Sequence, residues 1–461
     1  MKFNGLDRYA GKFPEYTELR AQENVQNVIA MLNGDVTANA RSAQGGISAR
    51  AYKDGVWGFA STPETSDAAI NHILEQSVMN ARFLASKSGQ NLDKALPSRP
   101  GSADKDFATK KTRFDQKSLI EFVKTLDEYC VKTYPWLASR LIQIASLDME
   151  KTLFTADKSQ AYSLTPRALI YVSMTKIENN EPVDLYDVYG GFGQFEDVFV
   201  KPEDMFVKID ELAGKLEQKA KGIYAKPGTH DVVLGPDLAG ILAHEAIGHT
   251  VEADLVLGGS VAADMMGKES ASPLVTLVDF ANTAMGKICP VPLWFDDEGV
   301  EARDAVLIDK GILKSFMHNK FSAQHFGVEP TGNARAFGFY DEPLIRMRNT
   351  AILPGTSKLS DMIASIDNGY YFTRSSNGQA DSTSEFMFGV VMGYEIKNGK
   401  IGSALRNATI SGIAFDMLKT VTMISDDMSW SCAGMCGKKQ PMPVGMGGPA
   451  IRCRINVGGR L

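Results

Sequence analysis

The sequence predicts an α+β protein, in which an N-terminal region of helices and antiparallel sheets precedes a β-rich C-terminal domain. Segments with helical and with strand periodicity alternate in the first half, whereas hairpin signals recur through most of the second half. The chain has 461 residues, which is more than one hydrophobic core normally organises. We therefore predict an N-terminal α+β domain over residues 1–226 and a β-rich C-terminal domain over residues 227–461.

Turn signals and apolar periodicity divide the N-terminal region into elements. The expected turns are Asn33-Gly34, Gly45-Gly46 and Asp54-Gly55. The expected helices are one that begins at Ser66 and two that span residues 118–134 and 204–222. Strands are expected at 142–155 and 161–175, a linker near 91–107, and a glycine-rich loop at 190–193.

The C-terminal region begins with a short apolar strand at 232–234, followed directly by Gly235, Pro236 and Asp237. Proline is favoured in the first turn of a helix, and a carboxylate there interacts well with the helix dipole, so a helix should start here. After this helix, turns are expected at 297–299, 310–311, 377–378 and 398–399. These turns predict a largely β domain that carries one important helix.

Composition excludes several classes of protein. The net charge is −6 and no run of five basic residues occurs, so a nucleic-acid partner is not expected, and Lys438-Lys439 is interpreted as solvated surface. No stretch approaches the ~20 apolar residues of a membrane span, and the N-terminus lacks a secretory apolar core. Five scattered cysteines do not suggest a disulfide framework. We therefore expect a soluble cytoplasmic protein without a membrane partner.

The segment His244-Glu245-Ala-Ile-Gly-His249 is the most informative in the chain. Imidazoles bind zinc, and a neighbouring carboxylate can act as general base on metal-bound water. The familiar peptidase spacing is one residue shorter, and at ~100° per residue these histidines would lie ~140° apart on a straight helix. They can share a metal only if the helix ends or bulges, which Gly248 would make easy. The alternative is a pair of helix-surface or core histidines.

A zinc site needs a third protein ligand. Glu252 lies three residues after His249 and could be a ligand itself or a partner that holds a ligand in place. Cys436 lies in a glycine-bracketed loop from which a thiolate could reach a metal, and Cys432 could pair with it less convincingly. For both cysteines the alternative is a small buried apolar side chain.

These residues resemble the TldD/PmbA family, also called modulators of DNA gyrase. The resemblance covers nearly the whole chain, and the segments that carry it are GISARAYKDGVWGFAST (46–62), HEAIGHTVEAD (244–254), FDDEG (295–299), TGNARA (331–336), NTAILPG (349–355) and GMCGK (434–438). The intact metal motif is typical of the catalytic TldD-type branch. One departure is Glu298, where a small polar residue is expected.

The resemblance implies one Zn²⁺ per chain, bound by His244, His249 and Cys436, with Glu245 as the catalytic base. It also implies a metallopeptidase that hydrolyses unstructured peptides or proteins, so the C-terminal domain would be the catalytic, metal-binding one. The expected partner is a metal-free PmbA/TldE-type paralogue, in a heterodimer or larger assembly, with a homodimer as the alternative.

Two further expectations concern the substrate. An extended peptide would bind as an added β-strand, because a β-rich domain offers edge groups to such a chain. Arg335 could bind a substrate carboxylate, although a structural salt bridge is the more common role for such a residue. The alternative function is a non-catalytic regulatory or binding protein with a structural metal site, which would normally be closed by four protein ligands.

Overall fold

The computed structural model describes residues 5–13, 15–88, 96–98, 100–380, 382–431 and 433–458. Its N-terminal half is built on one long, mostly antiparallel sheet with the strand order β3-β2-β1-β5-β6-β4 and with β7 beside β6. The strands are β1 (Tyr16–Leu32), β2 (Asp35–Lys53), β3 (Val56–Thr62), β4 (Ser102–Asp106), β5 (Ser139–Thr155), β6 (Gln160–Glu178) and β7 (Glu181–Phe192). The helices are η1 (Leu6–Lys12), α1 (Asp67–Ser88), α2 (Gln116–Thr133), α3 (Phe195–Val198), η2 (Pro202–Met205) and α4 (Phe206–Ala220).

Tight turns join the long strands into hairpins. At the turn between β1 and β2, Asn33 and Gly34 have φ values of 53° and 94°, which is the left-handed region that a two-residue hairpin requires. Asp54 and Gly55 make the equivalent turn between β2 and β3, so both turns predicted from the sequence are confirmed.

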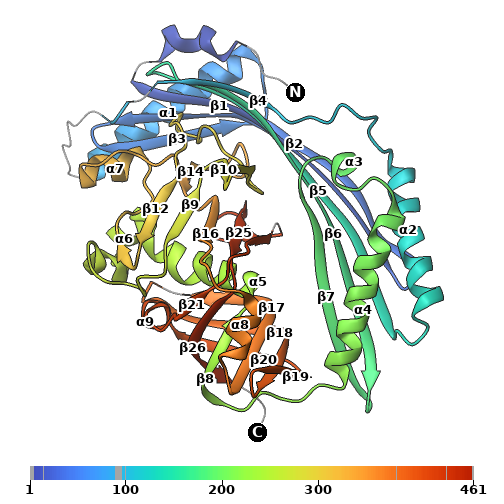
Figure 1. Cartoon of the computed structure of the whole chain (residues 1–461). Coiled ribbons are helices and arrows are strands. Elements are labelled where there is room, and N and C mark those ends of the chain that lie inside the picture. Colours follow the sequence, from blue (N-terminus) through green and yellow to red (C-terminus); the bar gives the residue numbers. More distant parts are fainter. Residues whose placement is uncertain are drawn as a thin grey trace.

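One face of this sheet is covered by α2 and α4, which lie beside it in Figure 1. Asp115 caps α2 by accepting a hydrogen bond from the backbone N–H of Ser118 at 2.7 Å. Apolar side chains of both helices pack on β1, β5 and β6 in one buried core, to which Leu126, Leu216 and Ile144 belong. The sheet's other face is turned toward the C-terminal half.

Two predicted turns are wrong, because their glycines lie inside strands: residues 45–46 in β2 and residues 377–378 in β17. In both places the glycine provides space for a ring rather than a reversal of the chain. A Cβ at Gly46 would come within 2.6 Å of the Phe339 ring, and a Cβ at Gly378 within 2.5 Å of the Phe388 ring.

Two predicted irregular segments are also partly wrong. Residues 190–192 of the predicted loop belong to β7, where a Cβ at Gly190 would meet the carbonyl oxygen of Ala168 at 2.2 Å. Residues 102–106 of the predicted linker form β4, which pairs in parallel with β6. Residues 91–95 and 99 of that linker lie outside the described residues.

The C-terminal half contains two larger sheets. One has the order β13-β12-β9-β16-β25-β22, and the other has the order β17-β8-β26-β20-β18-β19 with β21 beside β26. Because β17 also pairs with β18, the strands β17, β8, β26, β20 and β18 form a closed ring. The strands are β8 (Gly228–Leu234), β9 (Leu277–Phe280), β10 (Thr283–Ala284), β11 (Lys287–Ile288), β12 (Ala305–Asp309), β13 (Ile312–Leu313), β14 (Ala334–Arg335), β15 (Leu344–Ile345), β16 (Asn349–Ile352), β17 (Asn368–Ala380), β18 (Glu385–Lys397), β19 (Lys400–Ala404), β20 (Ala408–Ile413), β21 (Met423–Ile424), β22 (Ser429–Ser431), β23 (Met435–Cys436), β24 (Met442–Pro443), β25 (Gly445–Gly448) and β26 (Ile451–Gly458).

A central helical segment lies between these two sheets. It starts with α5, as predicted, and continues into the π-helix η3, both of which contact β16, β17 and β25. The helical elements of this half are α5 (Pro236–Ile241), η3 (Leu242–Gly248), η4 (His249–Val251), α6 (Ala253–Leu257), η5 (Val261–Met265), α7 (Lys320–Phe326), α8 (Leu359–Ala364) and α9 (Ala414–Lys419). Among the described residues, every helix falls short of the length or the apolar character that a membrane-spanning helix needs.

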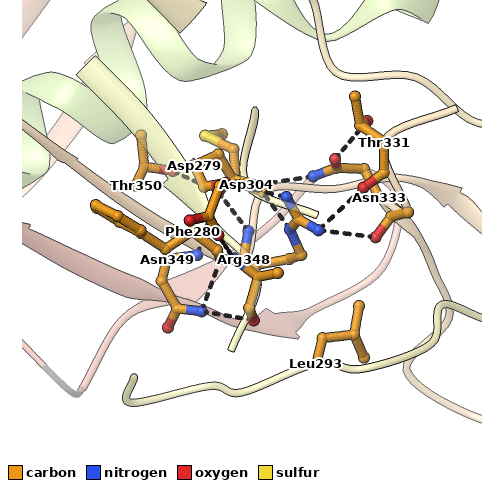
Figure 2. A network of polar contacts seen from close by, with 12 residues as sticks. Asp279, Phe280, Leu293, Asp304, Thr331, Asn333, Arg348, Asn349 and Thr350 are labelled. Carbon is orange, nitrogen blue, oxygen red and sulfur yellow. Dashed lines mark hydrogen bonds and ion pairs between the residues drawn. The ribbon is translucent and has the colours of Figure 1, made fainter. Parts of the chain in front are cut away.

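A buried ion pair joins the inner strand β9 to the residue that precedes β16 (Figure 2). The guanidinium of Arg348 donates from Nε to Asp279 Oδ2 at 2.8 Å, and neither side chain is exposed. Its Nη atoms donate to the backbone carbonyls of Arg303, Thr331 and Gly332. The TGNARA and NTAILPG segments therefore meet at a structural network.

Charged side chains also join the N-terminal sheet to the C-terminal half. Arg50 of β2 donates to Glu298 at 2.5 Å, and Lys151 of β5 donates to Asp297 at 2.6 Å. Glu298 is fully buried, and its other carboxylate oxygen accepts the backbone N–H of Lys320. The glutamate that departs from the family's pattern therefore has a structural partner on the opposing sheet.

Candidate metal centre and active site

The helix that carries the histidines departs from α-helical geometry, as the spacing requires. Residues Leu242–Gly248 form a π-helix, and the backbone N–H of His249 donates to the carbonyl oxygen of His244, five residues earlier. A π-helix turns through a smaller angle per residue, so a five-residue separation returns to the same side. The two imidazole rings accordingly lie with centroids 5.3 Å apart.

The predicted role of Gly248 in this departure is wrong. Gly248 has right-handed helical angles, φ −53° and ψ −48°, so it neither breaks the helix nor uses a glycine-only conformation. Its lack of a side chain serves packing instead, because a Cβ there would lie 2.0 Å from Met347 Sδ. Gly248 thus lets the π-helix lie directly against Met347, in the segment between β15 and β16.

His244, His249 and Cys436 converge in space. Each offers one potential ligand atom, and the three atoms lie within 4.8 Å of one another. Among the described residues, these three form the group that could hold a metal ion. Cys436 Sγ is 3.3 Å from His249 Nε2, although the two residues are 187 positions apart. The His244 side chain is 1% exposed, whereas that of His249 is 19% exposed. Cys432 lies outside the described residues.

Glu252 orients His249. Its carboxylate accepts from His249 Nδ1 at 2.8 Å, which leaves Nε2 directed at Cys436. Glu252 is fully buried and also contacts Lys438 Nζ at 3.3 Å. Burial alone would raise the pKa of Glu252, but His249 and Lys438 lower it. Between the two roles predicted for Glu252, the geometry matches the partner of a ligand, because such a carboxylate commonly fixes the tautomer of a metal-binding histidine.

Lys438 is not a solvated surface residue, contrary to the prediction. Its ammonium group contacts Asp254 at 2.6 Å and donates to the carbonyl oxygen of Ile345, and only 12% of its side chain is exposed. Lys438 thereby neutralises part of the negative charge that Glu252 and Asp254 bring to the site.

The surroundings favour a thiolate at Cys436. Burial would raise the pKa of this thiol, but the two neighbouring imidazoles outweigh that effect and lower the pKa to about 4. For His249, burial would lower the pKa, but Glu252 and Cys436 raise it to about 10. A thiolate, and not a thiol, is the form of cysteine that binds metals.

These residues fit a metal ion. Both ring nitrogens of His244 are buried and make no hydrogen bond within the described part of the chain. Buried polar atoms are normally satisfied, so two unsatisfied nitrogens on one ring indicate a missing partner. Two imidazoles and one thiolate form a donor set that suits zinc and leaves a coordination position open.

Glu245 lies next to this group and faces open space. Its carboxylate is 3.6 Å from His249 Nε2 and 4.0 Å from His244 Nε2, and 24% of the side chain is exposed. It lines a cavity of about 340 Å³, which we call the active-site cavity. The cavity lies between the N-terminal sheet, represented by Tyr171, and the loop that carries Met435.

Two arginines that the sequence analysis did not single out hold the Cys436 loop. Arg346 is fully buried and donates to the carbonyl oxygens of Cys436 and Gln440, each at 2.7 Å. Arg167 of β6 donates to the carbonyl oxygen of Gly434 at 3.1 Å. No short motif predicts such side-chain-to-backbone contacts, because they form only between distant segments.

Arg335 belongs to the same scaffold. Its guanidinium is buried and donates to the carbonyl oxygens of Met347 at 2.5 Å and Pro443 at 2.9 Å. These contacts give Arg335 a structural role. Arg335 is not among the residues that line the active-site cavity.

Comparison with known proteins identifies the family. Models described as PmbA/TldA metallopeptidase domain 1 and PmbA/TldA metallopeptidase C-terminal domain match residues 17–81 and 227–459. A zinc metalloprotease TldD homolog of Saccharolobus solfataricus is 28% identical over 96% of each chain. A metalloprotease of Methanocaldococcus jannaschii is 30% identical over 95% of this chain and 96% of its own.

A solved structure shows the same fold. The chain from Thermotoga maritima, described as a modulator of a DNA gyrase, superposes with a TM-score of 0.80 at 19% identity and covers 98% of both chains. The mixed α/β architecture and the family expected from the sequence are therefore confirmed. These matches show that the chain belongs to the PmbA/TldA metallopeptidase family.

Proposed function

We propose that this chain hydrolyses peptide bonds in unstructured peptides or proteins, with one zinc ion held by His244, His249 and Cys436 and with Glu245 as general base. The observation that carries the proposal is the convergence of two imidazoles and one thiol from distant segments, beside a carboxylate that opens onto a cavity. The names of the curated relatives, one of which includes zinc, support the choice of metal and reaction.

Each residue of the group has a separate task. When bound, zinc supplies Lewis-acid chemistry that acidifies water and polarises a carbonyl group. The Glu245 carboxylate accepts a proton from the attacking water and delivers it to the leaving nitrogen of the cleaved amide. Glu252 keeps the His249 ring oriented, and the burial of His244 excludes bulk water from one side of the site.

An exposed sheet edge beside the active-site cavity is the reason to propose an extended substrate. β22 (Ser429–Ser431) is the terminal strand of its sheet, and Ser431, Ala433 and Gly434 line the active-site cavity together with Glu245. An extended peptide could add to this edge through backbone hydrogen bonds, which would place its backbone near Glu245. Such binding requires an unstructured substrate and tolerates many sequences. Assembly with a metal-free PmbA/TldE-type paralogue, or with a second copy of this chain, stays a prediction. A cytoplasmic location also stays a prediction.

Metal dependence of proteolysis tests the proposal. The purified chain, alone and with its paralogue, should degrade an unfolded protein after zinc loading, lose this activity on chelation, and regain it when zinc is added back. His249→Ala should neither retain zinc nor cleave. Activity that survives complete removal of metal would contradict the proposal, whereas stoichiometric zinc without any cleavage would favour the alternative of a regulatory protein with a structural metal.

A further inference from the structure

A second cavity, of about 180 Å³, lies on the inner face of the N-terminal sheet beside the active-site cavity. We call it the apolar pocket. The side chains that make its lining largely apolar are Val28, Ala145, Leu147, Leu169, Phe337 and Met435. A concave apolar surface next to a reactive group is the usual form of a ligand subsite.

Strand register explains why this face of the sheet is apolar. Val28 of β1 lies opposite Ala145 of β5, which in turn lies opposite Leu169 of β6. Because side chains alternate along a strand, the neighbouring residues Ile29 and Ile144 point to the other face, where α2 and α4 cover them. On the pocket face, Phe337 and Met435 of the C-terminal half lie against these strands, and the apolar pocket is the space left between them.

The two cavities are neighbours. Tyr171 and Met435 line both of them, and Met435 directly precedes Cys436 in the chain. Met435 is 49% exposed, whereas Cys436 is buried. Arg167 restrains it, with Nη1 at 3.5 Å from Met435 Sδ and at 3.1 Å from the carbonyl oxygen of Gly434. A chain that lies in the active-site cavity can therefore place a side chain in the apolar pocket.

We propose that the apolar pocket binds one large apolar side chain of the peptide substrate, of the size of phenylalanine or leucine, at a fixed distance from the cleaved bond. This inference rests on the proposed function and adds a side-chain preference to it. A dry apolar cavity of about 150 Å³ accepts benzene, so the volume here suits a benzyl group. Because the apolar pocket shares Tyr171 and Met435 with the cavity that Glu245 lines, the occupant we propose is part of the substrate.

Cleavage-site profiling tests this proposal without assuming which substrate position, counted from the cleaved bond, enters the apolar pocket. An unfolded protein mixture would be digested by the zinc-loaded wild-type chain, and the new termini would be mapped by mass spectrometry. We expect phenylalanine, leucine and methionine to be enriched at one fixed position within about four residues of the cut. In matched synthetic peptides, phenylalanine at that position should raise kcat/KM roughly 10- to 100-fold over serine, the gain expected from burying one large apolar side chain.

A filling substitution provides the second arm. Ala145→Phe should occupy the apolar pocket and abolish the preference for phenylalanine over serine. Ala43→Phe is the matched control, because Ala43 is exposed and lies on the opposite face of the same sheet by strand alternation. This control should retain the preference of the wild-type chain.

Failure of this inference can be separated from failure of the proposed function. Cleavage without enrichment at any position would overturn the proposed role of the apolar pocket and leave the peptidase proposal intact. So would an unchanged preference for phenylalanine over serine in Ala145→Phe. Binding supplies a readout that does not need turnover. Fluorescence anisotropy on the zinc-loaded Glu245→Gln chain should give a lower Kd for the phenylalanine peptide than for the serine peptide, and equal Kd values would overturn the inference even if no cleavage occurs.

Discussion

The backbone N–H of His249 donates to the carbonyl oxygen of His244, and this five-residue hydrogen bond aligns the two imidazoles on one side of the helix. On a straight α-helix the same residues would diverge by ~140°. The π-helix thus accommodates the extra residue in H-E-x-x-x-H. In this arrangement Glu245 lines the active-site cavity. π-Helical segments are uncommon and occur frequently at functional sites.

Substitution of Gly248 should damage the metal centre through packing. Gly248→Ala places a Cβ about 2.0 Å from Met347 Sδ, so either the methionine or the π-helix must move. We expect a loss of about 1–3 kcal/mol in the free energy of unfolding, as for other overpacked interiors, together with weaker zinc binding. Urea-induced unfolding and zinc competition titration measure the two effects.

The matched control is Gly437→Ala. Gly437 adjoins Cys436 just as Gly248 adjoins His249, but a Cβ at Gly437 would meet nothing within 4 Å. This substitution should leave unfolding and zinc affinity close to wild type. Equal damage from both alanines would show that tight packing against Met347 is not the reason for a glycine at 248.

Removal of the negative charge on Glu252 should weaken metal binding. Glu252→Gln loses the carboxylate that accepts from His249 Nδ1, so the ring is less strongly oriented. Loss of such a partner typically lowers metal affinity about 10- to 100-fold. The control is Asp254→Asn, which removes another carboxylate partner of Lys438. An effect of Asp254→Asn as large as that of Glu252→Gln would attribute the loss to net charge rather than to orientation of His249.

Substitutions of Cys436 and Cys432 distinguish an open metal site from a closed one. Cys436→Ser should lose stoichiometric zinc, because the thiolate near His249 disappears. Cys432→Ser should keep one zinc per chain and keep proteolysis. If Cys432→Ser instead loses the metal, four protein ligands would close the site, as is usual for structural zinc. Inductively coupled plasma mass spectrometry of both variants gives the answer.

The interface between the two halves should respond to pH through Glu18. Burial, and then the neighbouring Glu298, raise the pKa of Glu18 from 4.5 to about 8, against the opposing effects of Lys320 and Arg50. The folded chain therefore keeps a proton that the unfolded chain releases. The stability that this group contributes is fully present below about pH 4.5 and is lost as the pH rises through about 8.

Glu18→Gln mimics the protonated side chain and should not lose this stability. The Tm of the variant minus the Tm of the wild-type chain should therefore rise by a few degrees between about pH 5 and about pH 8. Differential scanning calorimetry at both pH values measures the difference, with the exposed Glu64→Gln as the control for loss of a carboxylate. A difference that falls with pH would show that Glu18 is ionised in the folded chain.

Local signals in the sequence predicted much of the fold. Asn33-Gly34 and Asp54-Gly55 form the expected hairpin turns, because φ values above zero favour these residues wherever they occur. Gly46 was indistinguishable from a turn glycine, because its purpose is to admit the ring of Phe339, which is 293 positions away. Close approaches of this kind depend on tertiary packing, and a single sequence does not record them. The domain boundary near residue 226 stays a prediction.

The sequence likewise predicted part of the candidate site, and the remaining part depends on tertiary packing. The spacing of His244 and His249 required a departure from the α-helix. The glycine-bracketed loop made Cys436 a candidate ligand, and the resemblance to a family selected it from the alternatives. The π-helix itself has no local signature, since the backbone hydrogen bond from His249 to His244 depends on how the helix packs between two sheets. Arg346 was missed for the same reason, because its partners are backbone carbonyls of a remote loop.

One measurement tests the central claim most directly: hydrolysis of an unfolded protein by Glu245→Gln at the same zinc occupancy as wild type. Zinc content and cleavage would be determined on the same preparations. If Glu245 is the general base, zinc per chain should be unchanged while hydrolysis falls by at least about 100-fold. A Glu245→Gln chain that retains zinc and cleaves at the wild-type rate would contradict the account.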